Sequence, residues 1–155
     1  MFKVDTKEPP RRFFEDFPEG LEMPEVIKGP MNAGHQVRWA GACDNYASDF
    51  HHDAAAARAK GLPGLLLSGP FMAAYMLTEV THWLGRDARV LSFWDRNNAT
   101  TMPDDMAHIR ARVKRAWTED GAGRVEIDCE IVNQHGKVTT PGGVTAQLPM
   151  RGARS

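Results

Sequence analysis

The sequence has little that would attract a polyanion or cross a membrane. Nineteen Lys and Arg residues nearly balance 20 Asp and Glu residues and leave a net charge of -1, so no overall field attracts nucleic acid or an anionic membrane. The longest apolar stretch, residues 62–77, is interrupted by glycine, proline and serine, and no segment is predicted to span a bilayer. Residues 1–20 are polar and contain no apolar run typical of a signal peptide.

Cysteine is also scarce. Cys43 and Cys129 lie far apart and have neither zinc-knuckle nor CxxC spacing, so reduced thiols in a cytoplasmic protein are expected. A chain of 155 residues is long enough to bury a real core. Residues 1–155 are interpreted as a single domain, with an irregular lead-in over residues 1–20 where prolines disfavour regular structure.

The clearest predicted element is an apolar helix between residues 68 and 85. Ser68 is a candidate N-cap, Pro70 suits the first turn and Gly85 can end the helix. Between them apolar side chains surround nearly the whole circumference, and only Glu79 adds a charge. A helix of this kind is expected to be buried on almost every side.

Shorter elements precede this helix. An extended piece is predicted around residues 23–27, and a short helix over residues 36–43, where apolar residues recur at helical spacing. The alanine-rich segment that follows Asp53 is a second short helix, with Asp53 as its expected cap and Gly61 as its end.

After Gly85 the pattern changes to strict alternation of apolar and polar residues, typical of strands with one buried face. Glycine-containing breaks such as "TEDGAG" and "NQHGK" separate these segments as hairpin turns would. The sequence therefore predicts an α+β fold in which an antiparallel sheet wraps around the long central helix. The predicted strands lie at residues 88–95, 107–117, 124–132 and 142–149.

The segment "DNYASDFHHD", residues 44–53, concentrates acids and two histidines in ten residues. The side chains of His51, His52 and Asp53 are adjacent in sequence and diverge on an ordinary backbone, so a metal site is not expected. The sequence also lacks an HExxH spacing. What remains is a general acid/base site or a polar loop without chemistry.

A sheet wrapped around a helix is the hotdog architecture, and several segments resemble the MaoC-like dehydratases, which include (R)-specific enoyl-CoA hydratases. The resemblance covers roughly residues 12–149. Its most specific parts are His-x-Asp followed by alanine and Gly-Leu-Pro, and the "VTTPG" strand. It implies a hydratase or dehydratase that adds water to an enoyl-CoA thioester or removes it from a 3-hydroxyacyl-CoA. Coenzyme A is then part of the substrate, and no metal or redox cofactor is expected.

The family uses an aspartate and a histidine as a dyad, with a backbone N–H at the start of the central helix holding the thioester carbonyl. Carried over by motif, the histidine is His51 and the oxyanion donor is the N–H of Gly69. Counting back from His51 by the family's interval reaches Tyr46, which is no acid. The loop is one or two residues longer, so the acid is either Asp44 or is replaced by Asn45, with Asp49 as a third candidate.

The same resemblance predicts residues that contact the substrate around this dyad: Ser68, Tyr46, Asp49 and Arg96. Arg110, Arg112 and Lys114 share one strand face, which is either solvated or a basic rim for the phosphates of coenzyme A. Exposed sheet edges favour self-association, as a homodimer or with another hotdog chain.

Two other functions stay open. The altered dyad motif favours a non-catalytic or half-active partner subunit that completes a heteromeric hydratase. A thioesterase on the same scaffold would direct the activated water at the carbonyl carbon instead of Cβ.

Overall fold

The computed structural model describes residues 8–43 and 49–152. In this part of the chain five strands form one sheet in the order β1-β3-β4-β5-β2, and every neighbouring pair is antiparallel. The prediction of an α+β fold is confirmed. The strands are β1 (Val26–Lys28), β2 (Arg89–Asp95), β3 (Ala107–Glu119), β4 (Ala122–Val132) and β5 (Val138–Leu148).

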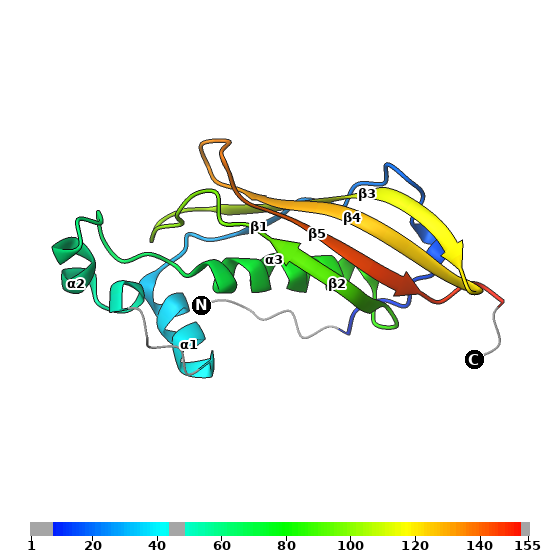
Figure 1. The fold of residues 1–155 in the computed structure, drawn as a ribbon, viewed down its shortest axis with the longest axis horizontal. Coiled ribbons are helices and arrows are strands. Elements are labelled where there is room, and N and C mark those ends of the chain that lie inside the picture. The colour runs from blue at the N-terminus through cyan, green and yellow to red at the C-terminus, as the bar shows by residue number, and fades with distance from the viewer. Residues whose placement is uncertain (1–7, 44–48, 153–155) are drawn as a thin grey trace.

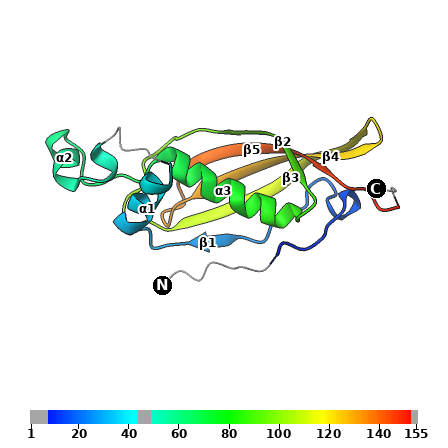
Figure 2. The same ribbon diagram turned by 90° about the horizontal axis from the view of Figure 1, so that it is seen from below.

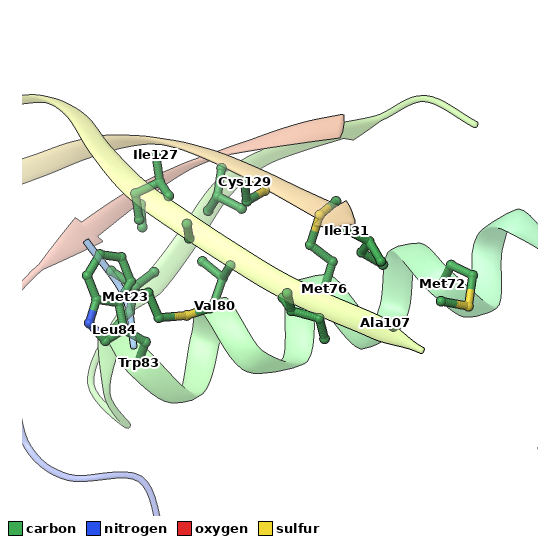
Figure 3. Close-up of a cluster of buried hydrophobic side chains, with 14 of the residues drawn as sticks. Met23, Met72, Met76, Val80, Trp83, Leu84, Ala107, Ile127, Cys129 and Ile131 are labelled. Atoms are coloured by element: carbon green, nitrogen blue, oxygen red, sulfur yellow. The ribbon is translucent and has the colours of Figure 1, made fainter. Parts of the chain in front are cut away.

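Helix α3 (Gly69–Leu84) lies in the hollow of the curved sheet, as Figures 1 and 2 show. Its sheet-facing residues interlock with the alternating apolar residues of β3 and β4, and Figure 3 shows this cluster. Full burial of each large side chain contributes about 1.5–3 kcal/mol. The cluster confirms the predicted period-two pattern, and it includes Met72, Met76, Val80, Leu84, Ile109, Val113, Ile127 and Ile131.

Both ends of α3 are where the sequence predicts them. Ser68 is the N-cap with extended backbone, and Pro70 occupies the first turn, where its missing N–H costs no hydrogen bond. Gly85 ends the helix at φ 96°, in the left-handed region. A Cβ on Gly85 would lie 2.5 Å from the carbonyl oxygen of Pro10, so glycine is required there for space as well as for conformation.

One flank of α3 differs from the prediction that the helix is buried on almost every side. Ala74, Tyr75 and Leu77 are only partly buried, and Thr78 is exposed. The reason is geometrical, because a single curved sheet covers only the side of the helix that faces it.

Three short elements gather near the N-terminus of α3 (Figure 1). They are α1 (Ala33–Cys43), the 3-10 turn η2 (Asp49–His51) and α2 (Ala54–Ala59). Asp53 caps α2 as predicted, since its Oδ1 accepts hydrogen bonds from the N–H groups of Ala55 (2.8 Å) and Ala56 (3.1 Å). A second 3-10 turn, η1 (Phe14–Asp16), lies near the amino-terminal end of the described chain.

The basic residues of β3 lie on the outer face of the sheet. Arg110 Nε is 2.6 Å from Glu25 Oε1, and Lys114 Nζ is 2.6 Å from Glu126 Oε1. These exposed pairs contribute little stability individually. Both interpretations of this strand face, a solvated surface or a basic rim for phosphates, stay predictions.

Candidate active site

A cavity of about 330 Å³ lies where the start of α3 meets the chain that follows β2. Its two walls are joined by a short antiparallel bridge, in which the N–H of Leu67 donates to the carbonyl oxygen of Thr101 at 2.9 Å. His51 and Gly69 both line this cavity, as the proposed chemistry requires. The described lining consists of His51, Leu66, Leu67, Gly69, Met72, Asn97, Asn98, Ala99, Thr100 and Thr101.

The ring of His51 is held by the backbone of Leu66. His51 Nδ1 lies 2.8 Å from the carbonyl oxygen of Leu66, and the N–H of Leu66 donates back to the carbonyl of Phe50 at 3.1 Å. Because a carbonyl oxygen only accepts, Nδ1 carries the proton, and in the neutral ring Nε2 is then the acceptor. The contact therefore fixes the tautomer that a general base needs.

The start of α3 is held from the other side by Gln36 of α1. Gln36 is 1% exposed, and its Oε1 accepts a hydrogen bond from the N–H of Ser68 at 2.8 Å. Ser68 is equally buried, and its Oγ has no hydrogen-bond partner among the described residues. As the first residue of the helix, Gly69 has no acceptor for its N–H within α3, so this group and the helix dipole favour a negatively charged oxygen nearby.

The side chain of Asn97 lies directly beside Gly69. A Cβ on Gly69 would lie 2.0 Å from Asn97 Nδ2 and 2.6 Å from Asn97 Oδ1. The amide of Asn97 thus occupies the space beside the predicted oxyanion donor.

Other residues that were predicted to belong to the site either do not line this cavity or lie outside the described residue ranges. Asp49 forms an ion pair with Lys60, whose hydrogen bond lowers the pKa of the Asp49 carboxyl below its ordinary value. Arg96 is exposed after β2, and its backbone N–H donates to the carbonyl of Pro141 at 3.0 Å. The roles assigned to Asp49 and Arg96 stay predictions, as do those of three residues outside the described ranges: Asp44, Asn45 and Tyr46.

Sequence reasoning missed Asn97, Asn98, Thr101 and Gln36. A signal for the first three was present, since the polar run "RNNATT" follows directly on an apolar strand and must lie near a sheet end. Nothing in the sequence marked Gln36 as a buried residue of the site, because a single amide in a short helix is usually on the surface.

Among the described residues, the cavity lining contains no carboxylate. No group of three or more His, Cys, Asp or Glu side chains within residues 8–43 and 49–152 is arranged to hold a metal ion. In the same ranges, no helix combines the length and the apolar character that a membrane crossing demands.

No protein-family model and no curated protein matches the sequence. Solved structures do match. The unliganded R-hydratase PhaJ1 from Pseudomonas aeruginosa superimposes with a TM-score of 0.80 at 16% identity, over 90% of this chain and 86% of that one. A MaoC-like dehydratase from Rhodospirillum rubrum gives a TM-score of 0.78 at 21% identity, over 92% and 99% of the two chains.

This chain has the hotdog fold of those hydratases. The resemblance inferred from the sequence is confirmed at the level of the fold. A further structural match is the ChsH1-ChsH2 complex from Mycobacterium tuberculosis, with a TM-score of 0.74 at 21% identity over 84% of this chain and 98% of the matched chain. At such identities the shared fold does not by itself assign an activity.

Proposed function

We propose that this hotdog protein is an acyl-CoA hydratase/dehydratase. It adds water to an enoyl-CoA thioester and, in reverse, removes water from a 3-hydroxyacyl-CoA. The observation that carries the proposal is the meeting of His51 and Gly69 on one cavity, with the acceptor nitrogen of the imidazole set by Leu66. Neither a metal nor a redox group is part of the proposed chemistry.

In the hydration direction, His51 Nε2 takes a proton from a water molecule, and the water oxygen forms a bond to Cβ of the enoyl group. The electron pair of the double bond moves toward the thioester, and negative charge develops on its carbonyl oxygen. The N–H of Gly69 stabilises that charge at the start of α3. Cα then takes a proton from an acid, which recovers a proton from His51 and completes the addition of H and OH.

The acid in this scheme is Asp44. In the alternative, Asn45 positions the water, and the protonated His51 itself gives the proton to Cα. Asp44 and Asn45 both precede η2 in the chain, and the described lining of the cavity holds no carboxylate of its own. In a second candidate, this chain is a partner subunit and another hotdog chain supplies the acid. The structural match to a ChsH1-ChsH2 complex supports the same candidate.

For both candidate functions, the proposal includes association of this chain with a second hotdog chain. The partly exposed apolar flank of α3 and the free edge of β2, with Trp94 53% exposed, would be covered by a second hotdog chain. A cytoplasmic location is proposed as well, because Cys43 and Cys129 are free thiols.

The test is hydration of crotonyl-CoA and of a longer enoyl-CoA by the purified protein, followed by loss of the enoyl absorbance. His51→Ala is expected to lower kcat by about 1000-fold, the contribution of a well-placed general base. His52→Ala, which alters the adjacent imidazole, is the matched control and is expected to retain activity.

The possible outcomes separate the candidates. Equal activity of wild-type protein and His51→Ala would contradict the proposed role of His51. Activity that appears only after a second hotdog chain is added would favour the partner subunit. Release of free thiol without loss of the double bond, followed with a thiol reagent, would indicate a thioesterase.

A further inference from the structure

The side chain of Asn97 lies beside the first residue of α3. Its amide lies beside Gly69, with Nδ2, Cγ and Oδ1 at 2.0, 2.5 and 2.6 Å from where a Cβ of residue 69 would be. Asn97 is nevertheless an exposed residue that lines the cavity. A polar side chain of the cavity lining thus lies beside the first residue of α3.

The backbone around Asn97 is held firmly. On one side, the N–H of Arg96 donates to the carbonyl of Pro141 at 3.0 Å, and on the other, the N–H of Asn98 donates to the carbonyl of Thr139 at 2.9 Å. Both acceptors belong to β5, a strand in the interior of the sheet. Asn97 is therefore carried by the rigid part of the fold.

The amide of Asn97 makes no hydrogen bond to any residue in the described ranges, which leaves its donor available to a ligand. The neighbouring hydroxyl of Ser68 is also without a partner among the described residues. Buried polar groups are normally satisfied. The unpartnered hydroxyl of the buried Ser68 therefore indicates a polar ligand atom beside Gly69.

Covalent geometry limits how far apart the two donors can be. The backbone nitrogen of a residue lies about 2.5 Å from its own Cβ position, and Asn97 Nδ2 lies 2.0 Å from that position at Gly69. The Gly69 nitrogen and Asn97 Nδ2 are therefore separated by no more than about 4.5 Å. Two donors this close can both reach one oxygen at an ordinary hydrogen-bond length of about 2.9 Å.

We propose that Asn97 is a catalytic residue, whose Nδ2–H is the second donor to the thioester carbonyl oxygen beside the N–H of Gly69. This inference rests on the proposed hydratase function and deepens it. In the ground state the amide contacts a weakly polar carbonyl. As the double bond accepts water, the oxygen becomes negatively charged and both contacts strengthen, so Asn97 contributes mainly to kcat.

The experiment compares Asn97→Ala and Asn97→Asp with wild-type protein, and uses Gln147→Ala as a matched loss of an amide outside the cavity. Thermal unfolding of each variant first establishes that it folds. Asn97→Ala is expected to lower kcat by about 100-fold, the effect of removing one oxyanion donor, while KM changes little. Asn97→Asp is expected to be slower still at neutral pH, because a carboxylate repels the developing negative charge.

The activity of Asn97→Asp is expected to depend on pH in a way that a purely structural role of residue 97 would not produce. A protonated carboxyl group is a donor and its ionised form is not. The ratio of kcat for Asn97→Asp to kcat for Asn97→Ala is therefore expected to rise as the pH falls toward the carboxyl range. A ratio that stays constant with pH would contradict the proposed hydrogen bond.

A binding measurement separates this inference from the proposed function. The probe is 4-(dimethylamino)cinnamoyl-CoA, a conjugated thioester whose absorption moves to longer wavelength when its carbonyl is polarised. The shift on binding to wild-type protein is expected to be reproduced by Gln147→Ala and reduced in both Asn97 variants.

A full shift with Asn97→Ala, or a higher KM at unchanged kcat, would overturn the role of Asn97 and leave the hydratase proposal standing. The wild-type protein could show an absorption shift that depends on Asn97 and yet hydrate no enoyl-CoA. That result would support Asn97 as a hydrogen-bond donor and refute the proposed hydratase activity. Failure of wild-type protein to bind the probe would overturn both.

Discussion

The two halves of helix α3 serve different purposes. The half toward Leu84 is packed into the sheet, where Met76, Val80 and Leu84 are fully buried (Figure 3). The half that begins at Gly69 adjoins the cavity, and two polar groups beside it, the amide of Asn97 and the hydroxyl of Ser68, lack partners among the described residues. Dry packing gives stability, whereas a buried polar group without a partner, such as the Ser68 hydroxyl, costs stability and is retained where a ligand can satisfy it.

Met76→Ala tests the packed half and is expected to have the largest effect on stability. The Met76 side chain is fully buried, and its Cε lies 2.5 Å from where a Cβ of Gly142 would be. Truncation leaves a cavity and should lower the free energy of unfolding by about 3 kcal/mol, with little change in kcat below the unfolding temperature. Urea unfolding measures the loss.

Thr78→Ala, on the exposed flank of the same helix, is the control for Met76→Ala. It is expected to change the free energy of unfolding by less than about 0.5 kcal/mol. If the two substitutions cost the same, the contrast between the packed side and the exposed flank would be refuted.

The thiol of Cys129 tests whether the core that covers the packed half of α3 excludes water. Burial raises the pKa of its thiol from about 9 to about 12. Between these values the unfolded chain releases the proton and the folded protein retains it, so stability falls as the pH rises above 9. By pH 10.5 the loss from this group is about 2 kcal/mol.

Urea unfolding at pH 8 and pH 10.5 measures this loss, with Cys129→Val as the variant that lacks the thiol. Groups common to both proteins cancel, so the variant is expected to lose less stability over this range than wild-type protein. Cys43→Val, at an exposed thiol, should behave as wild type. Identical losses of stability in all three proteins would show that the thiol of Cys129 is not shielded from water.

Gln36→Leu tests the cavity half and is expected to have a smaller effect on stability than Met76→Ala. Without the Gln36 carbonyl, the buried N–H of Ser68 loses its acceptor, which costs about 1.5 kcal/mol. The start of α3 is then less firmly held, so kcat should fall as well. Gln36→Glu keeps an acceptor oxygen and is expected to retain more stability and a higher kcat than Gln36→Leu. If Gln36→Leu retained more of both, the role of Gln36 in positioning the start of α3 would be contradicted.

The elements could be predicted from the sequence because local periodicity decided them. The alternation of Ile109, Ala111 and Val113 with basic residues marked the inner face of β3, and the structure buries all three. Ser68 and Gly85 marked the ends of α3 for equally local reasons of backbone geometry. The cap at Asp53 followed from residue chemistry within one helical turn.

The composition of the site could be predicted only in part. His51 and Gly69 were identified by motif, and the structure brings them to one cavity. Asn97 and Gln36 were missed, because each meets the start of α3 from a distant part of the chain, in the case of Gln36 from 32 residues earlier. No local pattern encodes a contact of that kind.

By itself, the sequence determined which segments become helix and strand and which of their faces are apolar, since these depend on spacing over a few residues. Only the tertiary structure decided that β1 joins the sheet beside β3, that one flank of α3 stays partly uncovered, and that an amide from the β2–β3 connection lies against the first residue of α3. The physical reason is that strand order, curvature and the meeting of distant side chains are set by how the whole layer closes over its core.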